Sequence, residues 1–524
     1  MGARHPAVIG PRSADRPRLV DGCPARARRD ERRASGVVSR RWAGGHGRGV
    51  ATSQIEPERI RDLNDAEPDG DGDYVLYWMQ ASQRAEHNPA LELAIQRANE
   101  HGVPLVVAAV VVADYPEASA RHFAFMLGGL GQALRAVERR GATVVVRSGD
   151  PVDEIAELAG DAVLVVVDRA YLRVLKGWRS DLAERLDVPV VQVEGDVVVP
   201  VDVASEEQEH AARTIRPKIN ERRDEFLVEL TTTSLDDTTS KRGLDPDVDL
   251  DEFDDVPALL SKLGLDGDGP QPVDWIEPGT SAAHARLDDF LDGVEDYDDR
   301  RNAYRDEAGV SFMSPYLHYG QISPVAVALE VLDRAGDRAE DYLEELVVRR
   351  ELARNYVERC RDYDSFSGLP EWARESLEAH RDDAREETYT ASELEAGETD
   401  DEVWNAIMFE IRERGWVHNQ LRMYWGKQFV RWTNTPEHAH RTLLEINNRW
   451  FLDGRDESSF TNVSWCFGLH DQGFKERDVS GKVRPFTTAA LERKDDLDAW
   501  VDEHGPADDG DDDGDSDGDE GDEG

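Results

Sequence analysis

Residues 404–471 read WNAIMFEIRERGWVHNQLRMYWGKQFVRWTNTPEHAHRTLLEINNRWFLDGRDESSFTNVSWCFGLHD and decide the fold of the second half of the chain. They hold six of the chain's twelve tryptophans, and no Pro or Gly run interrupts the first half of the stretch. Indole rings are large and mostly buried, and each N–H needs a partner, so an aromatic helical core is one interpretation. On composition alone, a functional role for the tryptophans is equally open.

Toward the N-terminus the pattern changes to five apolar runs that are typical of strands. They are YVLYWM (74–79), PLVVAAVVV (104–112), TVVVR (143–147), AVLVVV (162–167) and VPVVQV (188–193). Continuous Val-rich runs indicate strands buried on both faces, so we expect a Rossmann-like, five-stranded parallel sheet in an α/β domain at residues 73–203. Asn88 followed by Pro89 is a good start for the first long helix. No G-x-G-x-x-G follows a strand, which makes a nicotinamide-dependent enzyme a weak candidate.

The remaining segments complete the expected domain organisation. Residues 204–280 are predicted to be an interdomain connector, with one helix around residues 209–230 and then a Gly-, Asp-, Pro- and Thr-rich surface stretch. Residues 281–503 contain no Val-rich strand and are predicted to form an all-α domain. The Asp- and Gly-rich tail at 505–524 is expected to be disordered and solvating.

The first 52 residues form an Arg-rich extension that we expect to be disordered. The first 50 carry a dozen Arg against four acidic residues, opposite in sign to the rest of the chain. A basic DNA-binding arm and an over-long gene model that starts properly near Val50 both remain open. The extension has no apolar segment of the kind a secretory signal needs.

Composition excludes several classes of protein. No run approaches about 18 uncharged apolar residues, so no membrane span is expected. Cys23, Cys360 and Cys466 are too scattered for a disulfide framework or a metal cluster, which fits a cytoplasmic protein without a metal. The net charge of −48 should repel DNA at low salt, but concentrated salt shortens the Debye length to about 3 Å at 1 M. A halophilic source would explain the charge.

Several motifs occur together in one order. They are YWMQASQRAEHNPAL (77–91), SPYLHYGQIS (314–323), EELVVRREL (344–352), RMYWGK (422–427), LDGRD (452–456) and HDQGFKER (470–477). In this order they resemble the class II cyclobutane pyrimidine dimer photolyases of the photolyase/cryptochrome family, over roughly residues 74 to 500. Chance agreement over several separate motifs is far less common than over one. With the acidic charge, the resemblance favours a haloarchaeal member.

The resemblance implies an α/β antenna-type domain and an all-α FAD-binding catalytic domain. FAD would act as FADH⁻ and would be bound by Tyr297, Ser311, Met313, Ser314, Arg422, Asn447, Asp453 and Arg455. Small hydroxyls at a helix start form an anion site, although a plain Ser cap is the commoner outcome. If Arg422 and Asp453 both point inward, each charge requires the other. The α/β domain would hold an antenna chromophore at most, an 8-hydroxy-deazaflavin or a folate.

The resemblance also assigns chemistry to other residues. The catalytic residues would be Glu345, Asn447, Trp465 and Met423, with Glu345 and Trp465 contacting the flipped-out dimer and Asn447 facing N5 of the flavin. Electrons would reach an oxidised flavin through Trp425, Trp404 and the outer donors Tyr389 or Trp432, because indole is readily oxidised; packing alone is the alternative for these rings. DNA would be bound by Arg349, Lys475, Arg477, Lys482 and Arg484, and residues 470–494 carry six basic against four acidic residues.

The expected activity is that of a deoxyribodipyrimidine photo-lyase, a carbon–carbon lyase that repairs pyrimidine dimers in ultraviolet-damaged DNA by light-driven electron transfer. We expect a monomer. A cryptochrome-like blue-light receptor on the same fold is the alternative, and a light-independent flavin oxidoreductase is a third, although it lacks a nicotinamide site.

Overall fold

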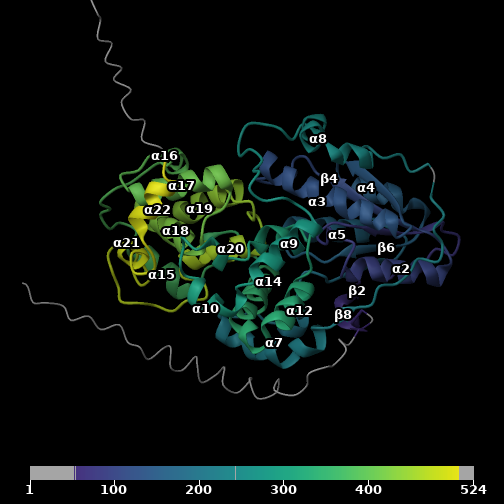
Figure 1. Ribbon diagram of the computed structural model, residues 1–524, viewed down its shortest axis with the longest axis horizontal. Coiled ribbons are helices and arrows are strands. Elements are labelled where there is room, and N and C mark those ends of the chain that lie inside the picture. The colour runs from purple at the N-terminus through teal and green to yellow at the C-terminus, as the bar shows by residue number, and fades with distance from the viewer. Residues whose placement is uncertain (1–51, 54, 242, 507–524) are drawn as a thin grey trace, which may run out of the picture. The chain divides into compact units, whose positions relative to one another are not determined.

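The computed structural model describes residues 52–53, 55–241 and 243–506 (Figure 1). The expectations for the Arg-rich extension and for the acidic tail therefore fall almost wholly outside the described residues. Within them, an α/β part precedes a helical part, as the sequence predicts.

The sheet of the α/β part has six strands in the order β2-β7-β6-β3-β4-β5. The bounds are β2 Ile60–Asp62, β3 Tyr74–Trp78, β4 Leu105–Val111, β5 Thr143–Ser148, β6 Ala162–Asp168 and β7 Val190–Val193. All five predicted strands are present and pair in parallel. Strand β2 is antiparallel to β7 and is not predicted from the sequence, because its three residues, IRD, carry no apolar pattern. A second, two-stranded sheet joins β1 (Thr52–Ser53) to β8 (Glu229–Leu230).

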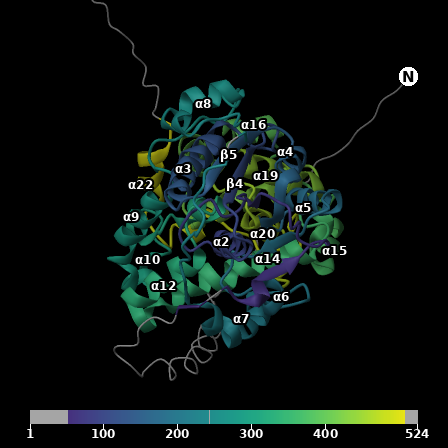
Figure 2. The ribbon, with the colours of Figure 1, turned by 90° about the vertical axis from the view of Figure 1, so that its right-hand side faces the viewer.

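Helices cover both faces of the large sheet. Leu105 and Val107 of β4 face the core formed with α2 (Pro89–His101) and α3 (Ala120–Arg139). Val106 and Ala108 face the opposite core, with α4 (Pro151–Leu158) and α5 (Arg173–Arg185). In Figure 2, β4 and β5 lie between α3 on one side and α4 and α5 on the other. The two-sided burial explains why the strands are uninterrupted Val-rich runs.

Local signals fix the start of α2 as predicted. The Asn88 side chain accepts hydrogen bonds from the backbone N–H groups of Ala90 and Leu91, and Pro89 follows it. An Asn cap with Pro in the first turn satisfies helix donors that would otherwise lack a partner.

The connector contributes to the core as well as to the surface. Its helices are α7 (Ala212–Phe226) and α8 (Val256–Leu263), and the short helix α6 (Val201–Ala204) leads into it. Phe253, Leu259 and Leu260 are buried in the same cluster as one face of the sheet. The connector therefore contributes side chains to the core of the α/β part as well as linking two domains. Its polar composition gives no sign of this role.

In the described residues from 280 to 506, the regular elements are all helices. They are α9 (Thr280–Leu291), α10 (Tyr297–Arg300), α11 (Met313–His318), α12 (Pro324–Ala335), α13 (Glu340–Leu343), α14 (Arg350–Arg359), α15 (Glu371–Ala379), α16 (Ala391–Ala396), α17 (Glu402–Arg414), α18 (Asn419–Trp432), α19 (Pro436–Trp450), α20 (Glu457–Cys466), α21 (Thr488–Leu491) and α22 (Leu497–His504). Helix α18 carries RMYWGK and packs against α17, α19 and α20. Among the described helices, none combines the length and apolar character that crossing a membrane requires.

Buried arginines join the α/β part to the helices. Arg84 donates to the carbonyls of Gly320 and Gly195. Arg121 donates to the carbonyls of Ile411 and Trp450, near the ends of α17 and α19. A guanidinium has five donors, so one buried Arg can satisfy several carbonyls at once.

Candidate active site

A cavity of about 640 Å³ lies among the helices of the second part. The walls contain most of the site residues that the sequence predicts. These are Tyr297, Ser311, Met313, Ser314, Glu345, Arg349, Arg422, Met423, Asp453, Trp465 and Arg484. They come from α10, α11, α18, α20, the π-helical turn Glu344–Arg349 and the loops between helices, so folding brings together residues up to 187 positions apart, as Tyr297 and Arg484 are.

Arg422 forms an ion pair with Asp453 and also binds the side-chain amide of Asn447. Its guanidinium donates to Asp453 at 3.1 Å and to the Asn447 side-chain oxygen at 2.7 Å. It also lies over the Phe451 ring, 3.7 Å from the centroid. Asn447 is 2% exposed and lies behind the cavity wall. The pair predicted from the sequence is therefore formed, and the buried amide is fixed by it.

Glu345 projects from an irregular helix. Residues Glu344–Arg349 form a π-helical turn between α13 and α14. Such turns are rare and frequently occur at functional sites, because the extra residue changes the direction of the side chains. Arg301 donates to Glu345 at 2.8 Å, and Arg349 donates to Glu344 at 3.0 Å. Glu345 and Arg349 both line the cavity. Each of the two carboxylates of the turn therefore has an arginine beside it.

Hydroxyl groups gather at the start of α11. Ser311 accepts a hydrogen bond from the Tyr342 hydroxyl at 3.1 Å, and Tyr342 packs edge-on against Tyr297. Ser314 is exposed to the cavity. Phe312, at φ 55°, has the left-handed backbone conformation that directs the chain into α11. The hydroxyls are thus arranged along one wall.

Four aromatic rings form a continuous path from the core toward the surface. Trp425 and Trp404 stack with centroids 6.4 Å apart and an interplanar angle of 16°. Trp432 is 5.6 Å from Trp404, and Tyr389 is 5.5 Å from Trp432. Trp425 and Trp404 are buried, whereas Tyr389 is partly exposed. The sequence leaves open which ring is outermost; in the structure Trp432 lies between Trp404 and Tyr389.

Trp425 is separated from the cavity by one ring. It does not line the cavity, but packs 5.7 Å from Phe451, the ring that Arg422 covers. Its indole N–H has no hydrogen-bond partner among the described residues. The aromatic path therefore begins immediately behind the Arg422 wall.

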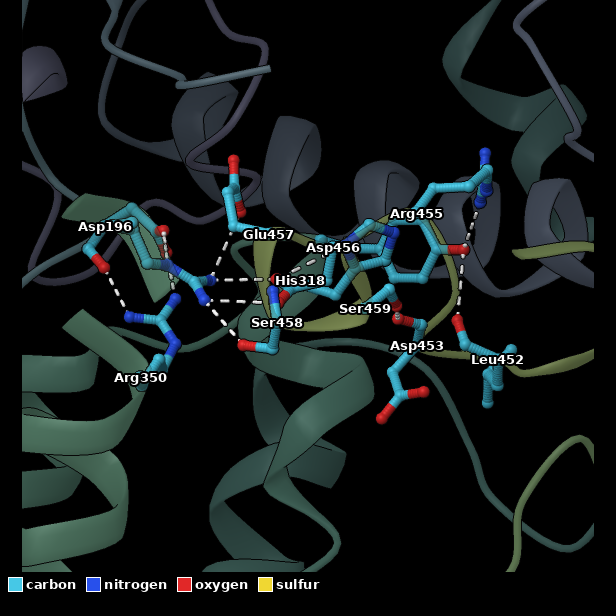
Figure 3. A network of polar contacts seen from close by, with 12 residues as sticks. Asp196, His318, Arg350, Leu452, Asp453, Arg455, Asp456, Glu457, Ser458 and Ser459 are labelled. Carbon is cyan, nitrogen blue, oxygen red and sulfur yellow. Dashed lines mark hydrogen bonds and ion pairs between the residues drawn. The ribbon is translucent and has the colours of Figure 1, made fainter. Parts of the chain in front are cut away.

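Arg455 does not lie where the sequence-based prediction puts it. Its guanidinium donates to the Tyr319 hydroxyl at 3.1 Å and lies over the Tyr115 ring. Figure 3 shows Arg455 and Asp453 pointing to opposite sides of the LDGRD segment. Arg455 lines a second cavity of about 160 Å³ and not the site cavity. Residues two apart in a loop need not share a direction, and a positive φ at Arg455 (68°) turns the chain there.

The second cavity lies at the carboxyl ends of β3, β4 and β6. Trp78, Tyr115, Phe123 and Trp178 are among its aromatic walls. Crevices outside the carboxyl ends of strands are the usual ligand sites of open α/β sheets. Gln80, which also lines it, has both side-chain polar atoms without a partner among the described residues.

Arg354 lies in a charged network between the two cavities. Its partners Asp196, Asp456 and Glu457 are labelled in Figure 3. Its guanidinium contacts Asp456 at 2.8 Å, Asp196 at 3.1 Å and Glu457 at 3.4 Å, and it is 1% exposed. Asp456 lines the site cavity, whereas Asp196 and Glu457 line the second cavity. This network escapes prediction from the sequence, since one Arg inside a helix gives no sign that distant carboxylates surround it.

The network shifts the protonation of its carboxyls. Arg354 holds the pKa of Asp456 well below its usual range, despite burial. Burial, together with the neighbouring Asp456, raises the pKa of Glu457 to about 7. One cation thus cannot compensate two adjacent buried carboxylates equally.

Four of the five basic residues predicted to bind DNA lie on a loop beside the cavity, whereas the fifth, Arg349, lines the cavity from the π-helical turn. Lys475, Arg477, Lys482 and Arg484 are exposed. The loop folds back on itself through hydrogen bonds from Phe474 N to Lys482 O and from Arg477 N to Gly481 O. Phe474 is 38% exposed, the only large apolar side chain so exposed among the described residues. Phe474 is not among the site residues predicted from the sequence. Its position among charged residues in HDQGFKER could have indicated an exposed aromatic ring.

Comparison with solved structures identifies the fold class. A class III photolyase from Agrobacterium tumefaciens superposes with a TM-score of 0.62 at 20% identity, covering 83% of this chain and 86% of that chain. A Synechocystis cryptochrome gives a TM-score of 0.63 at 14% identity, covering 82% and 88%. The chain therefore has the photolyase/cryptochrome fold.

Sequence comparison identifies the family. The DNA photolyase family model matches residues 75–236. A deoxyribodipyrimidine photo-lyase of Methanothermobacter thermautotrophicus is 41% identical over 454 residues, 86% of this chain and 98% of the relative. One from Arabidopsis thaliana is 34% identical, covering 86% and 93%, and one from Potorous tridactylus is 34% identical, covering 83% and 81%. The chain belongs to the DNA photolyase family.

Proposed function

We propose that the protein repairs pyrimidine dimers in ultraviolet-damaged DNA by light-driven electron transfer, as a class II cyclobutane pyrimidine dimer photolyase. The observation that supports this most directly is the cavity that joins Trp465 and Met423 to the Arg422–Asp453 pair, backed by the aromatic path. Relatives that carry the name deoxyribodipyrimidine photo-lyase match most of the chain. The class II motifs in the sequence favour the subtype.

The cavity fits a flavin dinucleotide by size and chemistry. Its volume of about 640 Å³ lies in the usual range for cofactor sites. Arg350 brings positive charge to its wall, and Ser311 and Ser314 bring hydroxyls, which suits a diphosphate. Arg422 and Asp453 would lie at the ring system and present donors and acceptors to its heteroatoms, with the Asn447 amide holding Arg422 from behind the wall. When bound and reduced, the flavin supplies the photoexcited electron that the dimer receives and returns.

The residues of the chain would hold the dimer outside the DNA stack. Trp465 offers an aromatic face to the pyrimidine pair, and Met423 fills the adjacent apolar space. Glu345 reaches the polar edge of a base, and its pairing with Arg301 fixes the carboxylate in place. Enclosure by these side chains excludes water from the dimer while its ring opens.

Trp425, Trp404, Trp432 and Tyr389 would deliver electrons from outside when the flavin is oxidised. Adjacent centroids are 5.5 to 6.4 Å apart along the path. Tyr389 hydrogen-bonds with Asp400, since its hydroxyl donates to the carboxylate at 3.2 Å and accepts from the backbone N–H at 3.0 Å. A carboxylate at this position accepts the phenol proton when the outermost ring loses an electron.

The loop of residues 470–486 would face duplex DNA. Lys475, Arg477 and Lys482 would bind phosphates, and the exposed Phe474 would occupy the space that the extruded dimer leaves. Arg484 lies over the Phe474 ring, 5.5 Å from its centroid, and lines the cavity, so it connects this loop to the site.

The second cavity would hold an antenna chromophore. Its aromatic walls suit a planar heteroaromatic ring, and the amide of Gln80 offers both a donor and an acceptor. An 8-hydroxy-deazaflavin or a folate is the class of ligand expected. A second absorbance band that excites repair, in addition to the flavin band, would identify it.

The net charge of −48 favours a halophilic source, and we propose a cytoplasmic monomer that works at high salt. Phosphate contacts weaken as salt rises, so stacking on Trp465 would supply a larger share of the affinity. The fold alone does not exclude a cryptochrome-like receptor, because a cryptochrome superposes equally well. Trp465, Met423 and Glu345 in one cavity favour repair.

The deciding experiment follows the purified protein in light and dark. Bound flavin is measured by absorbance, and dimer loss is measured in irradiated DNA at a near-physiological and a high salt concentration. We expect repair in light only. Flavin binding without dimer loss under any condition would favour the photoreceptor and would contradict the repair proposal.

A further inference from the structure

Lys427 is a buried cation to which the proposed mechanism gives no role. It lies on α18, one turn after Met423, and is 4% exposed. Its ammonium donates to the carbonyl of Cys466 at 2.8 Å and to that of Trp465 at 3.4 Å. It has no carboxylate partner at ion-pair distance in the part of the chain that the structure describes. A buried charge with no opposite charge is unfavourable, so it requires an explanation.

Close packing of two helices brings Lys427 to this place. A Cβ on the neighbouring Gly426 would lie 2.8 Å from the Cys466 sulfur, so glycine allows α18 to approach α20. The approach places the ammonium at the end of α20, where the last carbonyls lack helix partners and carry partial negative charge. An anchor for the end of α20 is the simplest role that these contacts allow.

A further contact goes beyond that anchor. The Lys427 ammonium lies over the Trp465 ring, 4.6 Å from its centroid. Trp465 lines the site cavity, whereas Lys427 does not, so the cation occupies the side of the indole away from the cavity. A desolvated cation over an indole is a strong form of the cation–π interaction.

We propose that Lys427 is the positioning residue for the dimer: it holds Trp465 flat against the cavity and supplies positive potential behind the ring for an anionic, flipped-out pyrimidine dinucleotide. The inference rests on the proposed function, because it takes Trp465 as the face on which the dimer stacks. Lys427 acts through Trp465 and touches neither flavin nor DNA.

The test compares three substitutions by equilibrium binding in the dark, using matched oligonucleotides with and without one dimer. Lys427→Met removes the charge, Lys427→Gln keeps a donor for the carbonyls, and Lys427→Arg keeps the charge. We expect Met and Gln to lower the preference for the dimer about tenfold, the scale of a buried cation–π contact, and Arg to keep most of it. Flavin content stays unchanged. Lys262→Met, on α8 in an ion pair with Glu252, is the control.

A double substitution separates positioning from general stability. On a Trp465→Ala background, Lys427→Met should cause no further loss of dimer preference, because its effect passes through the ring. An additive loss would overturn the proposal, and so would Lys427→Gln with wild-type preference. If Lys427→Met loses flavin or unfolds, the Gln variant alone decides.

The pH dependence gives an independent measurement. Burial lowers the pKa of Lys427 to about 8. A nearby anion raises that pKa, so dimer binding takes up a proton, and wild-type preference should fall between pH 7 and 9 while that of Lys427→Met stays flat. The other ionisable groups that face the ammonium are Cys466, whose pKa burial raises to about 11, Asp471 and Arg484. A wild-type profile as flat as that of the variant would contradict the proposal.

These outcomes also separate the inference from the function on which it rests. Wild-type protein that does not distinguish dimer from undamaged DNA would refute the proposed function. Wild-type protein that distinguishes them, with Lys427→Met doing so equally well, would refute only the role of Lys427.

Discussion

The two cavities differ in chemistry although they share a wall. The site cavity is lined by arginines, carboxylates and hydroxyls, whereas the second cavity is lined chiefly by aromatic and aliphatic side chains. Arg354 and its carboxylates lie between them. A polar cavity can hold a charged dinucleotide and exchange electrons and protons with it, whereas an apolar cavity can only hold a ring in place. The difference teaches that one fold can place a polar and a largely apolar space side by side, so the two cavities suit ligands of different chemistry.

Removal of Arg354 should damage both cavities and cause the largest effect. Arg354→Met leaves Asp456, Asp196 and Glu457 buried around an apolar side chain. Breaking such a buried network typically costs about 3–5 kcal/mol of unfolding free energy. Urea unfolding and flavin retention measure it. Arg449→Met, which removes an exposed pair with Glu395, is the control and should cost less than about 1 kcal/mol. Equal stability of the two variants would mean that Arg354 does not hold the wall.

Replacement of Trp425 should separate the site cavity from its electron supply. Trp425→Phe keeps an aromatic ring in the core but interrupts the path between Phe451 and Trp404 with a ring that is much harder to oxidise. We expect photoreduction of the oxidised flavin to be almost abolished, while repair by chemically reduced enzyme remains near normal. Absorbance during illumination and a dimer assay measure the two. Equal loss of both would assign Trp425 to packing. Trp416→Phe, outside the path, is the control.

The sequence predicts the fold well where one physical rule dominates. Double-sided burial of Val-rich runs reveals five strands, and Asn88 with Pro89 reveals the start of α2. Strand β2 and the core residues of the connector are not predicted. The structure of such short or polar-flanked segments depends on partners that are distant in the chain.

The site is predictable to the extent that motifs position side chains by backbone alone. Arg422, Asp453 and Glu345 meet at the cavity as the motifs imply. Arg455 turns away, since its direction depends on a positive φ that no spacing reveals. The environment of Arg354 is also not predicted from the sequence. Its partners come from segments around residues 196 and 456–457, which meet it only after the chain has folded.

Substitution of Glu345 should impair the site cavity alone. Glu345→Ala removes a carboxylate at the cavity and frees Arg301, while the pair of Arg422 and Asp453 stays intact. We expect repair to fall by about tenfold to a hundredfold, with flavin content and the second cavity unchanged, because one hydrogen bond to a charged group contributes about 1.5–3 kcal/mol. Single-turnover dimer loss is the measurement. Loss of flavin from this variant would place Glu345 at the cofactor instead. Glu344→Ala, whose partners are Arg216 and Arg349, tests a carboxylate of the same turn.

The smallest expected effect concerns Glu457, on the side of the second cavity. Its pKa is raised to about 7 in the folded protein, first by burial and then by Asp456, from an ordinary value of 4.5. An acid with a raised folded pKa favours the folded state at low pH, and that contribution is lost as pH rises through 7. Glu457→Gln cannot ionise, so it should match wild type near pH 4 and exceed it by at least about 1 kcal/mol at pH 8, since each pKa unit corresponds to about 1.4 kcal/mol. Urea unfolding across this pH range measures the difference. Glu225→Gln, at an exposed position of α7, should show no such trend. A Glu457→Gln variant that is less stable than wild type at pH 8 would mean that the pairing with Arg354 outweighs burial, and that the wall between the cavities carries both carboxylates charged.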